Sequence, residues 1–231
     1  MYFDTTYLCL MAPAFLLMIF AQWWVSSTYK KWSRIENSAH ISGAGTANRL
    51  IQYGGLNDVR VEPTGGNLTD HYDPRSKTLH LSRGVYEPAS VSAMAIAAHE
   101  LGHAMQDKVD YFPLRLRSAL VPVVNIGSSL GWILIIIGLM LQVVNISWLG
   151  VAAFATSALF ALATLPVELN ASSRAKALLA ETGLIQTQQD RDGVNAVLRA
   201  AAFTYVAALA TALLQLLYWV MRISGSSSRR R

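Results

Sequence analysis

Four long stretches without a charged residue or a histidine constrain this chain more than any other feature of its sequence. They are residues 7–25, 120–144, 146–165 and 200–221. Each has about the length, roughly 20 helical residues, that crosses the hydrocarbon core of a bilayer. Hydrophobic residues make up 53% of the 231 residues and charged residues only 14%, which excludes a disordered chain and an ordinary water-soluble globule. We therefore expect a polytopic α-helical membrane protein with four transmembrane helices.

The distribution of basic residues predicts the orientation of these helices. Of the nineteen Lys and Arg residues, eleven lie in residues 26–119 and four in residues 166–199, whereas none precedes the first helix. Because cytoplasmic segments are enriched in Lys and Arg, both polar segments are expected on the cytoplasmic side of a multi-pass protein of the plasma membrane. The C-terminal Arg222 and residues 229–231 run against this rule. Since the basic residues flank apolar segments, the sequence predicts no nucleic-acid partner.

The composition of the spans also limits the function. A pump or an ion-coupled transporter places ionisable residues inside the bilayer, and these four stretches contain none. The sequence therefore disfavours a transporter. The single cysteine, Cys9, excludes an intrachain disulfide and a metal site built from cysteines. We expect the chemistry in the polar segments.

The spans divide the chain into six parts. Residues 1–25 are expected to form an N-terminal anchor, and residues 26–119 a small α+β segment at the membrane surface. A transmembrane hairpin that turns near Asn145 follows in residues 120–165, because the connection between its two spans is very short. The remaining parts are a helical segment (166–199), the fourth transmembrane helix (200–221) and a basic flexible tail (222–231).

Local signals predict the elements of the α+β segment. Ser42 is a suitable N-cap for a helix that ends near Gly54 and Gly55. Residues 58–62 and 78–82 have the alternation and the β-branched content of two short strands. Turns are expected between the strands at Gly65-Gly66 and at Asp73-Pro74. The expected order is therefore helix, two strands, helix.

The second of these helices carries the decisive motif. Residues 90–106 are rich in alanine, begin with Ser90 as an N-cap and contain His99, Glu100 and His103 in the order His-Glu-Leu-Gly-His. Histidines four residues apart lie one turn apart on a helix, so both imidazoles can bind one metal ion while the glutamate projects toward metal-bound water. Such ligands suit a catalytic zinc, and we expect one Zn²⁺ per chain. The alternative is an ordinary surface helix with two solvated histidines.

A zinc site needs a third ligand on the same side of the membrane. The hairpin returns the chain to the side of the motif directly after residue 165, which makes Glu168 the first candidate. A glutamate just after Pro166 also suits the first turn of a new helix, where the helix dipole favours a carboxylate without any metal. Both interpretations stay open on position alone. His40 and His80 are further candidates, although no motif supports either.

Three stretches of the sequence are similar to the YugP-like family of membrane zinc metallopeptidases. They are LTDHYDP (68–74), AAHELGHAMQ (97–106) and LPVELNAS (165–172), and the resemblance spans most of the chain. It implies that residues 26–119 form a zincin-like segment and that the protein is a zinc-dependent endopeptidase. In that enzyme His99 and His103 are metal ligands and Glu100 is the catalytic base. Glu168 matches the downstream glutamate of the family, which favours it as the third ligand.

Four further residues are candidates for supporting roles. Asn170 stands where the resemblance leads us to expect an Asp, so it can form hydrogen bonds but supplies no charge, and Ser172 lies in the same stretch. His71 and Tyr72 are candidate donors to the oxyanion of the tetrahedral intermediate. Each also has a structural interpretation, His71 as a surface turn residue and Tyr72 as a packing residue. The strand at 78–82 is a candidate edge to which a substrate backbone could add.

Together these features predict a membrane-embedded zinc metalloendopeptidase in which Glu100 takes a proton from a zinc-activated water. Because Arg115, Arg117 and the second span closely follow the motif, we expect the active site at the membrane surface. The expected partners are the lipid bilayer and a protein or peptide substrate, including membrane-proximal segments. The alternative is a membrane scaffold or chaperone-like assembly factor with a structural metal, within an oligomer or bound to another membrane protein. Such a site would not need Glu100.

Overall fold

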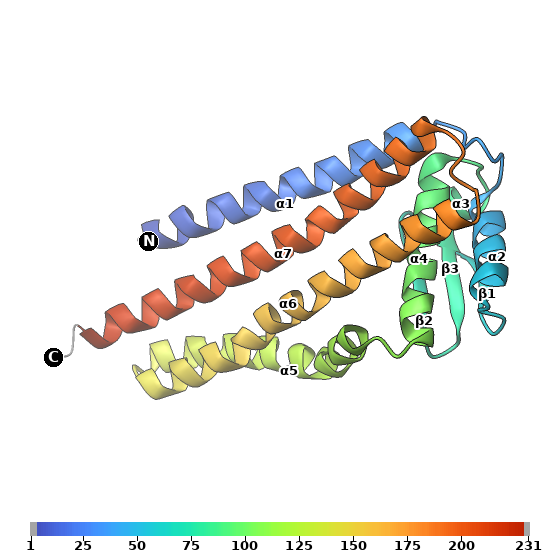
Figure 1. Cartoon of the computed structure of the whole chain (residues 1–231). Coiled ribbons are helices and arrows are strands. Elements are labelled where there is room, and N and C mark those ends of the chain that lie inside the picture. The colour runs from blue at the N-terminus through green and yellow to red at the C-terminus, as the bar shows by residue number, and fades with distance from the viewer. Residues whose placement is uncertain (1–3, 229–231) are drawn as a thin grey trace. The chain divides into compact units, whose positions relative to one another are not determined.

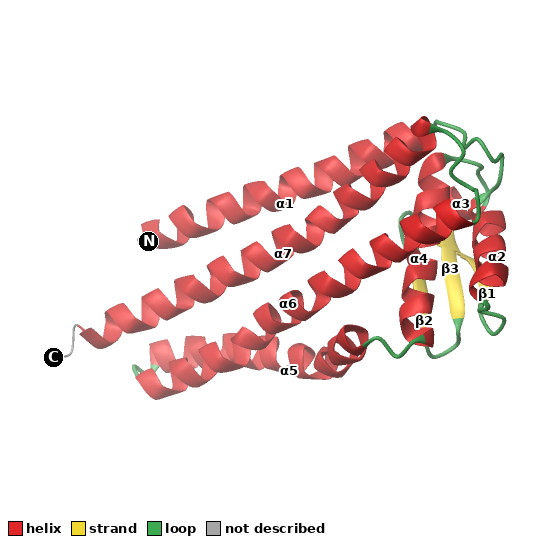
Figure 2. Cartoon of the chain, viewed as in Figure 1, coloured by secondary structure: helices red, strands yellow, loops and turns green. Residues whose placement is uncertain are grey.

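The computed structural model describes residues 4–228, which form seven helices and a three-stranded sheet (Figures 1 and 2). Four of the helices are long and apolar enough to cross a membrane, namely α1, α5, α6 and α7. The predicted helical membrane fold with a small α+β segment is thus confirmed. The elements are α1 (Thr5–Trp32), α2 (Gly43–Gly54), β1 (Arg60–Thr64), β2 (His71–Asp73), β3 (Thr78–Ser82), α3 (Arg83–Tyr86), α4 (Val91–Lys108), α5 (Phe112–Met140), α6 (Val144–Glu181) and α7 (Gln188–Ser228).

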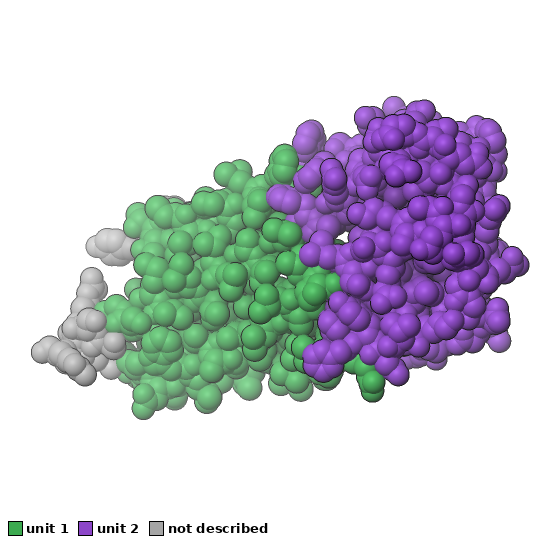
Figure 3. Space-filling view, in the orientation of Figure 1, with its two compact units in different colours: residues 1–21, 115–166, 204–231 green, residues 22–114, 167–203 purple. Residues whose placement is uncertain are grey.

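The chain divides into two compact units (Figure 3). Unit 1 comprises residues 1–21, 115–166 and 204–231, and it holds the apolar parts of the four long helices. Unit 2 comprises residues 22–114 and 167–203, and it holds the sheet and the shorter helices. The expectation of a flexible basic tail is wrong for residues 222–228, which continue helix α7, and residues 229–231 of that tail lie outside the described residues.

In unit 1, α5 and α6 form the expected hairpin with almost no space between their backbones. A Cβ atom on Gly150 of α6 would lie 2.8 Å from the carbonyl oxygen of Gly131 on α5. The turn lies at residues 141–143, where Gln142 has a φ of 58° and the Val143 amide bonds to the Gly138 carbonyl. The expected turn at Asn145 is therefore wrong by a few residues, because this bond reverses the chain before Asn145, which lies in α6.

By its sequence Pro166 suits the start of a helix, but this expectation is wrong. The residue lies inside α6, which runs without a break from Val144 to Glu181. A proline in a helix interior removes one backbone hydrogen bond and usually kinks or ends the helix. Here Val167, Ala171 and Ala175 follow it on one face and are completely buried in unit 2. Burial of this face offsets the local cost of the proline.

The sheet of unit 2 has the strand order β1-β3-β2, with β1 parallel and β2 antiparallel to β3. The expectation of two strands is wrong, because β2 adds a third strand that includes Asp73, and the turn follows it. β1 also begins at Arg60, two residues later than expected. Since β3 has a neighbour on each side, it offers no free edge to a substrate, contrary to the sequence-based hypothesis. The edges of the sheet are β1 and β2.

Capping residues define the helices next to the sheet as predicted. The Ser42 hydroxyl accepts a hydrogen bond from the Gly45 amide at the start of α2, which ends at Gly55 in the left-handed conformation with a φ of 61°. The Ser90 hydroxyl accepts one from the Ala93 amide at the start of α4. Apolar side chains dominate the core between these helices and the sheet, and the largest of them with no exposure are Leu50, Leu79, Leu81, Met94, Leu101 and Leu179.

Candidate metal centre

Helices α4 and α6 bring His99, His103 and Glu168 together within unit 2. The Nε2 atom of His99 lies 3.3 Å from Oε2 of Glu168, and the Nε2 atom of His103 lies 3.5 Å from the same oxygen. All three ligand atoms lie within 4.8 Å of one another, and no other such group of three potential ligands exists among the residues that the structure describes. The side chains are 11%, 12% and 3% exposed, respectively. They form one small, nearly buried cluster.

The spacing of these atoms fits a zinc ion. Zinc binds imidazole nitrogen and carboxylate oxygen with bonds of about 2.0–2.1 Å, so ligand atoms at tetrahedral angles lie about 3.3–3.4 Å apart. The two nitrogen-to-oxygen distances of 3.3 and 3.5 Å have this size. Two histidines and one glutamate are also a ligand set that catalytic zinc sites use, with a fourth position left open. The three side chains therefore fit the metal that the sequence predicts.

A close approach of α4 and α6 positions the three side chains of the cluster. A Cβ atom on Gly102 would lie 2.4 Å from the carbonyl oxygen of Ala171 and 3.0 Å from its Cα, so only glycine lets the two backbones come this near. Gly102 precedes His103 and lies one turn after His99 on α4. Glu168 lies one turn before Ala171 on α6. The glycine of the motif thus sets the separation between the histidines and the glutamate.

Further polar side chains contact the outer nitrogen of each imidazole. Ser172 Oγ lies 3.2 Å from Nδ1 of His99, and Gln106 Oε1 lies 3.0 Å from Nδ1 of His103. Asn170, the other residue expected in a supporting role, accepts hydrogen bonds from Gln106 and from Arg174. Sequence reasoning missed Gln106 and Arg174. The spacing could have indicated Gln106, because it follows His99 by two helical turns and therefore lies on the same face.

Glu100 lies between the two histidines in sequence and close to the cluster in space. Within residues 4–228, no hydrogen bond with another protein group engages its carboxylate, which leaves the group available to a water molecule or a substrate. Burial raises the pKa of Glu100, the neighbouring imidazoles of His99 and His103 lower it in part, and the carboxylate of Glu168 raises it further. Two carboxylates beside two imidazoles also supply the negative charge that balances a divalent cation.

The two candidate oxyanion donors lie on β2 and contact other groups. The Tyr72 hydroxyl donates a hydrogen bond of 2.8 Å to Asp107 on α4, and Lys77 pairs with the same carboxylate. Burial, together with Asp107, raises the pKa of Tyr72. Neighbouring residues of a strand face opposite sides of the sheet, so His71 faces away from Tyr72. No described contact joins either side chain to the metal cluster, and their role at the oxyanion stays a prediction.

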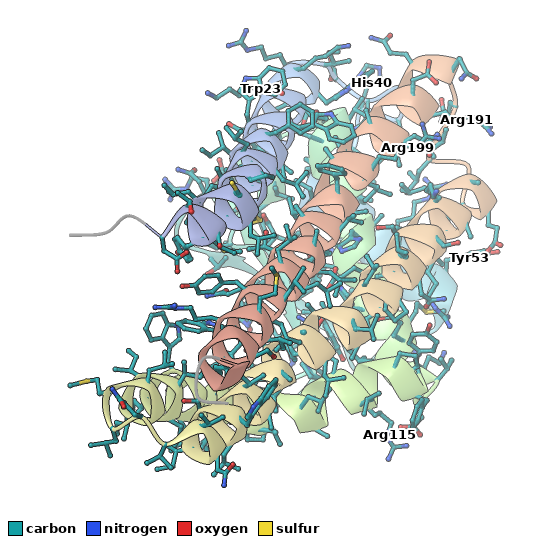
Figure 4. The ribbon with its side chains drawn as sticks, turned by 90° about the vertical axis from the view of Figure 1, so that its left-hand side faces the viewer. Trp23, His40, Tyr53, Arg115, Arg191 and Arg199 are labelled. Carbon is teal, nitrogen blue, oxygen red and sulfur yellow. The ribbon has the colours of Figure 1, made fainter. Side chains whose placement is uncertain are left out.

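The alternative histidine ligands are engaged elsewhere. His71 stacks on His80 of β3 with 4.8 Å between the ring centroids, and its Nδ1 donates to the carbonyl of Thr69. His40 lies in the loop after α1 and pairs with Glu36 at 2.8 Å (Figure 4). Neither His40 nor His80 belongs to the cluster of described ligands. Of the candidates for the third ligand, the structure brings only Glu168 to the two histidines of the motif.

Comparison with known proteins agrees with this geometry. Residues 7–224 match the family described as "Putative neutral zinc metallopeptidase". A curated relative from Bacillus subtilis (strain 168), named "Putative membrane protease YugP", is 45% identical over 205 residues, which cover 89% of this chain and 91% of the relative. No solved structure matches the chain. The chain therefore belongs to this family, which is described as "Putative neutral zinc metallopeptidase".

Proposed function

We propose that this protein is a zinc-dependent endopeptidase whose metal is held by His99, His103 and Glu168, with Glu100 as the general base. The observation that carries the proposal is the cluster itself, in which three ligand atoms from two helices lie within 4.8 Å of one another. A histidine pair from the motif and a glutamate from a distant part of the chain meet there at distances that fit zinc. The membership of the family supports the same reaction class.

The side chains have distinct roles in the proposed hydrolysis. Zinc bound at this site would polarise the scissile carbonyl and activate a water molecule. Glu100 accepts the proton of that water and passes it to the leaving nitrogen, so no covalent intermediate with the protein is needed. His99 and His103 present Nε2 atoms toward Glu168, and the near burial of all three keeps bulk water away from the ligand atoms.

The position of the ligands along the chain supports an active site at the membrane surface. Glu168 follows the end of the expected third span by three residues, and His103 precedes the start of α5 by nine residues. Arg115, which Figure 4 labels on α5, suits an interface next to lipid headgroups. The excess of Lys and Arg in residues 26–119 favours the cytoplasmic side of the plasma membrane. Peptide segments close to the bilayer are therefore the proposed substrates.

Metal analysis of the detergent-purified protein tests the ligand set without a known substrate. We expect one zinc per chain in the wild type and a clearly substoichiometric content in Glu168→Ala. Glu181→Ala is a matched control, because Glu181 lies on the same helix but is exposed. An unchanged zinc content in Glu168→Ala would remove Glu168 from the site. A wild type without zinc would overturn the proposed function.

A second variant separates catalysis from a structural metal site. Glu100→Gln should keep the full zinc content, because Glu100 is not one of the three clustered ligands. Hydrolysis of a fluorescently labelled unfolded protein should fall by roughly 100-fold or more, the usual contribution of a general base. If this variant retains both zinc and wild-type hydrolysis, the assignment of Glu100 as the base is wrong.

A further inference from the structure

A partly buried series of hydrogen bonds leads from His103, away from the candidate metal cluster, to the guanidinium of Arg174. His103 Nδ1 lies 3.0 Å from Oε1 of Gln106, a residue with no solvent exposure. The Gln106 amide nitrogen donates to the carbonyl of Val167 at 2.7 Å and to Oδ1 of Asn170 at 3.0 Å. Arg174 Nε donates to the same Oδ1 at 2.8 Å. Gln106 of α4 is thereby bonded to two residues of α6, one of which is itself held by Arg174.

Two groups in this series of hydrogen bonds can bond in only one direction. The Val167 carbonyl can only accept, so Gln106 must present its amide nitrogen there and its oxygen to His103. The Arg174 guanidinium can only donate, so Asn170 must present its oxygen to both Arg174 and Gln106. Because Gln106 offers His103 an acceptor, Nδ1 of His103 must carry a hydrogen. The neutral imidazole then keeps its lone pair on Nε2, which is the atom that faces Glu168.

We propose that Gln106 and Asn170 are positioning residues that hold His103 in the Nδ1–H form and so preset Nε2 as a metal ligand. This inference rests on the proposed zinc site. A ligating histidine commonly donates its other ring N–H to a fixed acceptor, and that acceptor orients the ring and raises its basicity. Gln106 is such an acceptor, and its own orientation is set by Val167 and by the Asn170–Arg174 pair.

The other histidine of the motif is held differently. His99 Nδ1 lies 3.2 Å from the hydroxyl of Ser172, which can rotate and can donate or accept. That contact therefore does not select one protonation form of His99. The two ligands are unequal: His103 is preset by a polar network, whereas His99 adapts to the metal. We expect zinc affinity to depend more on Gln106 than on Ser172.

The Asn170–Arg174 pair provides a variant that separates positioning from simple packing. Asn170 acts only through its oxygen, which accepts from both neighbours. An aspartate at this position would keep an oxygen acceptor of the same size and would add an ion pair with Arg174. A leucine would have similar volume but no acceptor. Asn170→Asp should therefore preserve the function of the chain of hydrogen bonds, and Asn170→Leu should interrupt it.

The test is the zinc dissociation constant of the full-length protein in detergent, measured by competition with a chelator at fixed pH. Gln106→Met should weaken zinc binding roughly 10- to 100-fold, the usual effect of losing an outer hydrogen-bond partner of a ligand. Ser172→Ala should weaken it clearly less. Asn170→Leu should weaken it in the same direction as Gln106→Met, and Asn170→Asp should bind zinc at least as tightly as the wild type.

Several outcomes would overturn the inference. Wild-type affinity in Gln106→Met, a larger loss in Ser172→Ala, or equal losses in Asn170→Asp and Asn170→Leu would each do so. If Gln106→Met does not fold, the comparison of the two Asn170 variants still decides, and thermal unfolding of the metal-free proteins corrects for any loss of stability. A wild type that binds no zinc would refute the proposed function as well, whereas unchanged affinities in variants of a zinc-binding wild type would refute this inference alone.

Discussion

The two units of the molecule distribute polar and apolar side chains in opposite ways. Unit 1 exposes large apolar side chains such as Phe15, Leu16 and Ile19, and its described part buries only two polar residues, Ser147 and Thr164. Unit 2 buries a larger set of polar and charged groups, among them Asn37, Gln106, Glu168 and Asp190. The exposed apolar surface of unit 1 is stable in lipid and would be costly in water. The two units are therefore built for different solvents.

Hydrogen bonds stabilise buried polar groups of unit 2 such as Asn37. The amide nitrogen of Asn37 donates to the carbonyls of Ile41 and Ser90, and its oxygen accepts from the Ile41 amide. A buried polar group costs free energy unless it is hydrogen-bonded, and such bonds also fix its direction. Buried polar side chains with fixed hydrogen bonds are thus concentrated in unit 2, which carries the candidate ligands, whereas the interior of unit 1 relies mainly on close packing.

The largest expected difference between the units is the loss of stability when a leucine is replaced by alanine. Leu101 is completely buried in the core of unit 2, and Leu162 on α6 is 56% exposed in unit 1. Leu101→Ala should lower the free energy of unfolding by about 2–5 kcal/mol, because it leaves a cavity. Leu162→Ala leaves no cavity, so it should lower the free energy of unfolding by less than about 1 kcal/mol. Chemical unfolding of both variants in the same detergent measures the difference, and equal losses would contradict the contrast.

A pair of arginine substitutions tests whether unit 1 lies in lipid and unit 2 in water. Leu16 lies in the middle of the first apolar stretch, whereas Leu68 is an exposed loop residue of unit 2. Leu16→Arg should disfavour membrane insertion by about 2.5–3.5 kcal/mol, the cost of a charge at the centre of a spanning helix. Leu68→Arg should insert like the wild type. The inserted fraction in membrane preparations is the measurement, and normal insertion of Leu16→Arg would show that α1 does not span the bilayer.

The close contact between α4 and α6 at Gly102 predicts a smaller effect, on both stability and zinc content. Gly102→Ala places a Cβ atom 2.4 Å from the Ala171 carbonyl, so α4 and α6 must separate. Overpacking of this kind should reduce stability by about 1–3 kcal/mol, and zinc content should fall because the ligands move apart. A Cβ atom on Gly65 would have no neighbour within 4 Å, so Gly65→Ala is the control. A stable Gly102→Ala variant with full zinc content would show that this contact does not set the ligand spacing.

The sequence predicts those features that depend on local pattern or on composition. The four spans follow from their length and lack of charge. The helix of His99 and His103 follows from its cap and from the spacing of the motif. The strand β2 is not predicted, because its three residues resemble a turn and its extended conformation comes from pairing with β3, which local sequence does not encode.

Features that depend on distant contacts can be predicted only in part. The hairpin indicates Glu168, because it returns the chain to the side of the motif. The continuous helix through Pro166 is not predictable in this way, since tertiary burial decides the conformation around the proline. Gln106 reaches Val167 and Asn170 only because α4 approaches α6 closely at a glycine, and no local pattern gives that distance.

The smallest expected effect concerns a partly buried charge in unit 2. Asp70 accepts hydrogen bonds from the amide and the hydroxyl of Ser82 at 2.7 and 3.0 Å. Burial raises the pKa of Asp70, and the bonds from Ser82 lower it only in part. An acid whose pKa is raised on folding binds its proton more tightly in the folded state, so stability falls as pH rises through the raised pKa.

Asp70→Asn keeps an oxygen acceptor for Ser82 but removes the charge. We expect the variant to be slightly more stable than the wild type at neutral pH, and the two thermal unfolding curves should converge below the ordinary Asp pKa of 3.8. A wild type that is more stable at neutral pH would mean that the charged bonds to Ser82 outweigh the cost of burial.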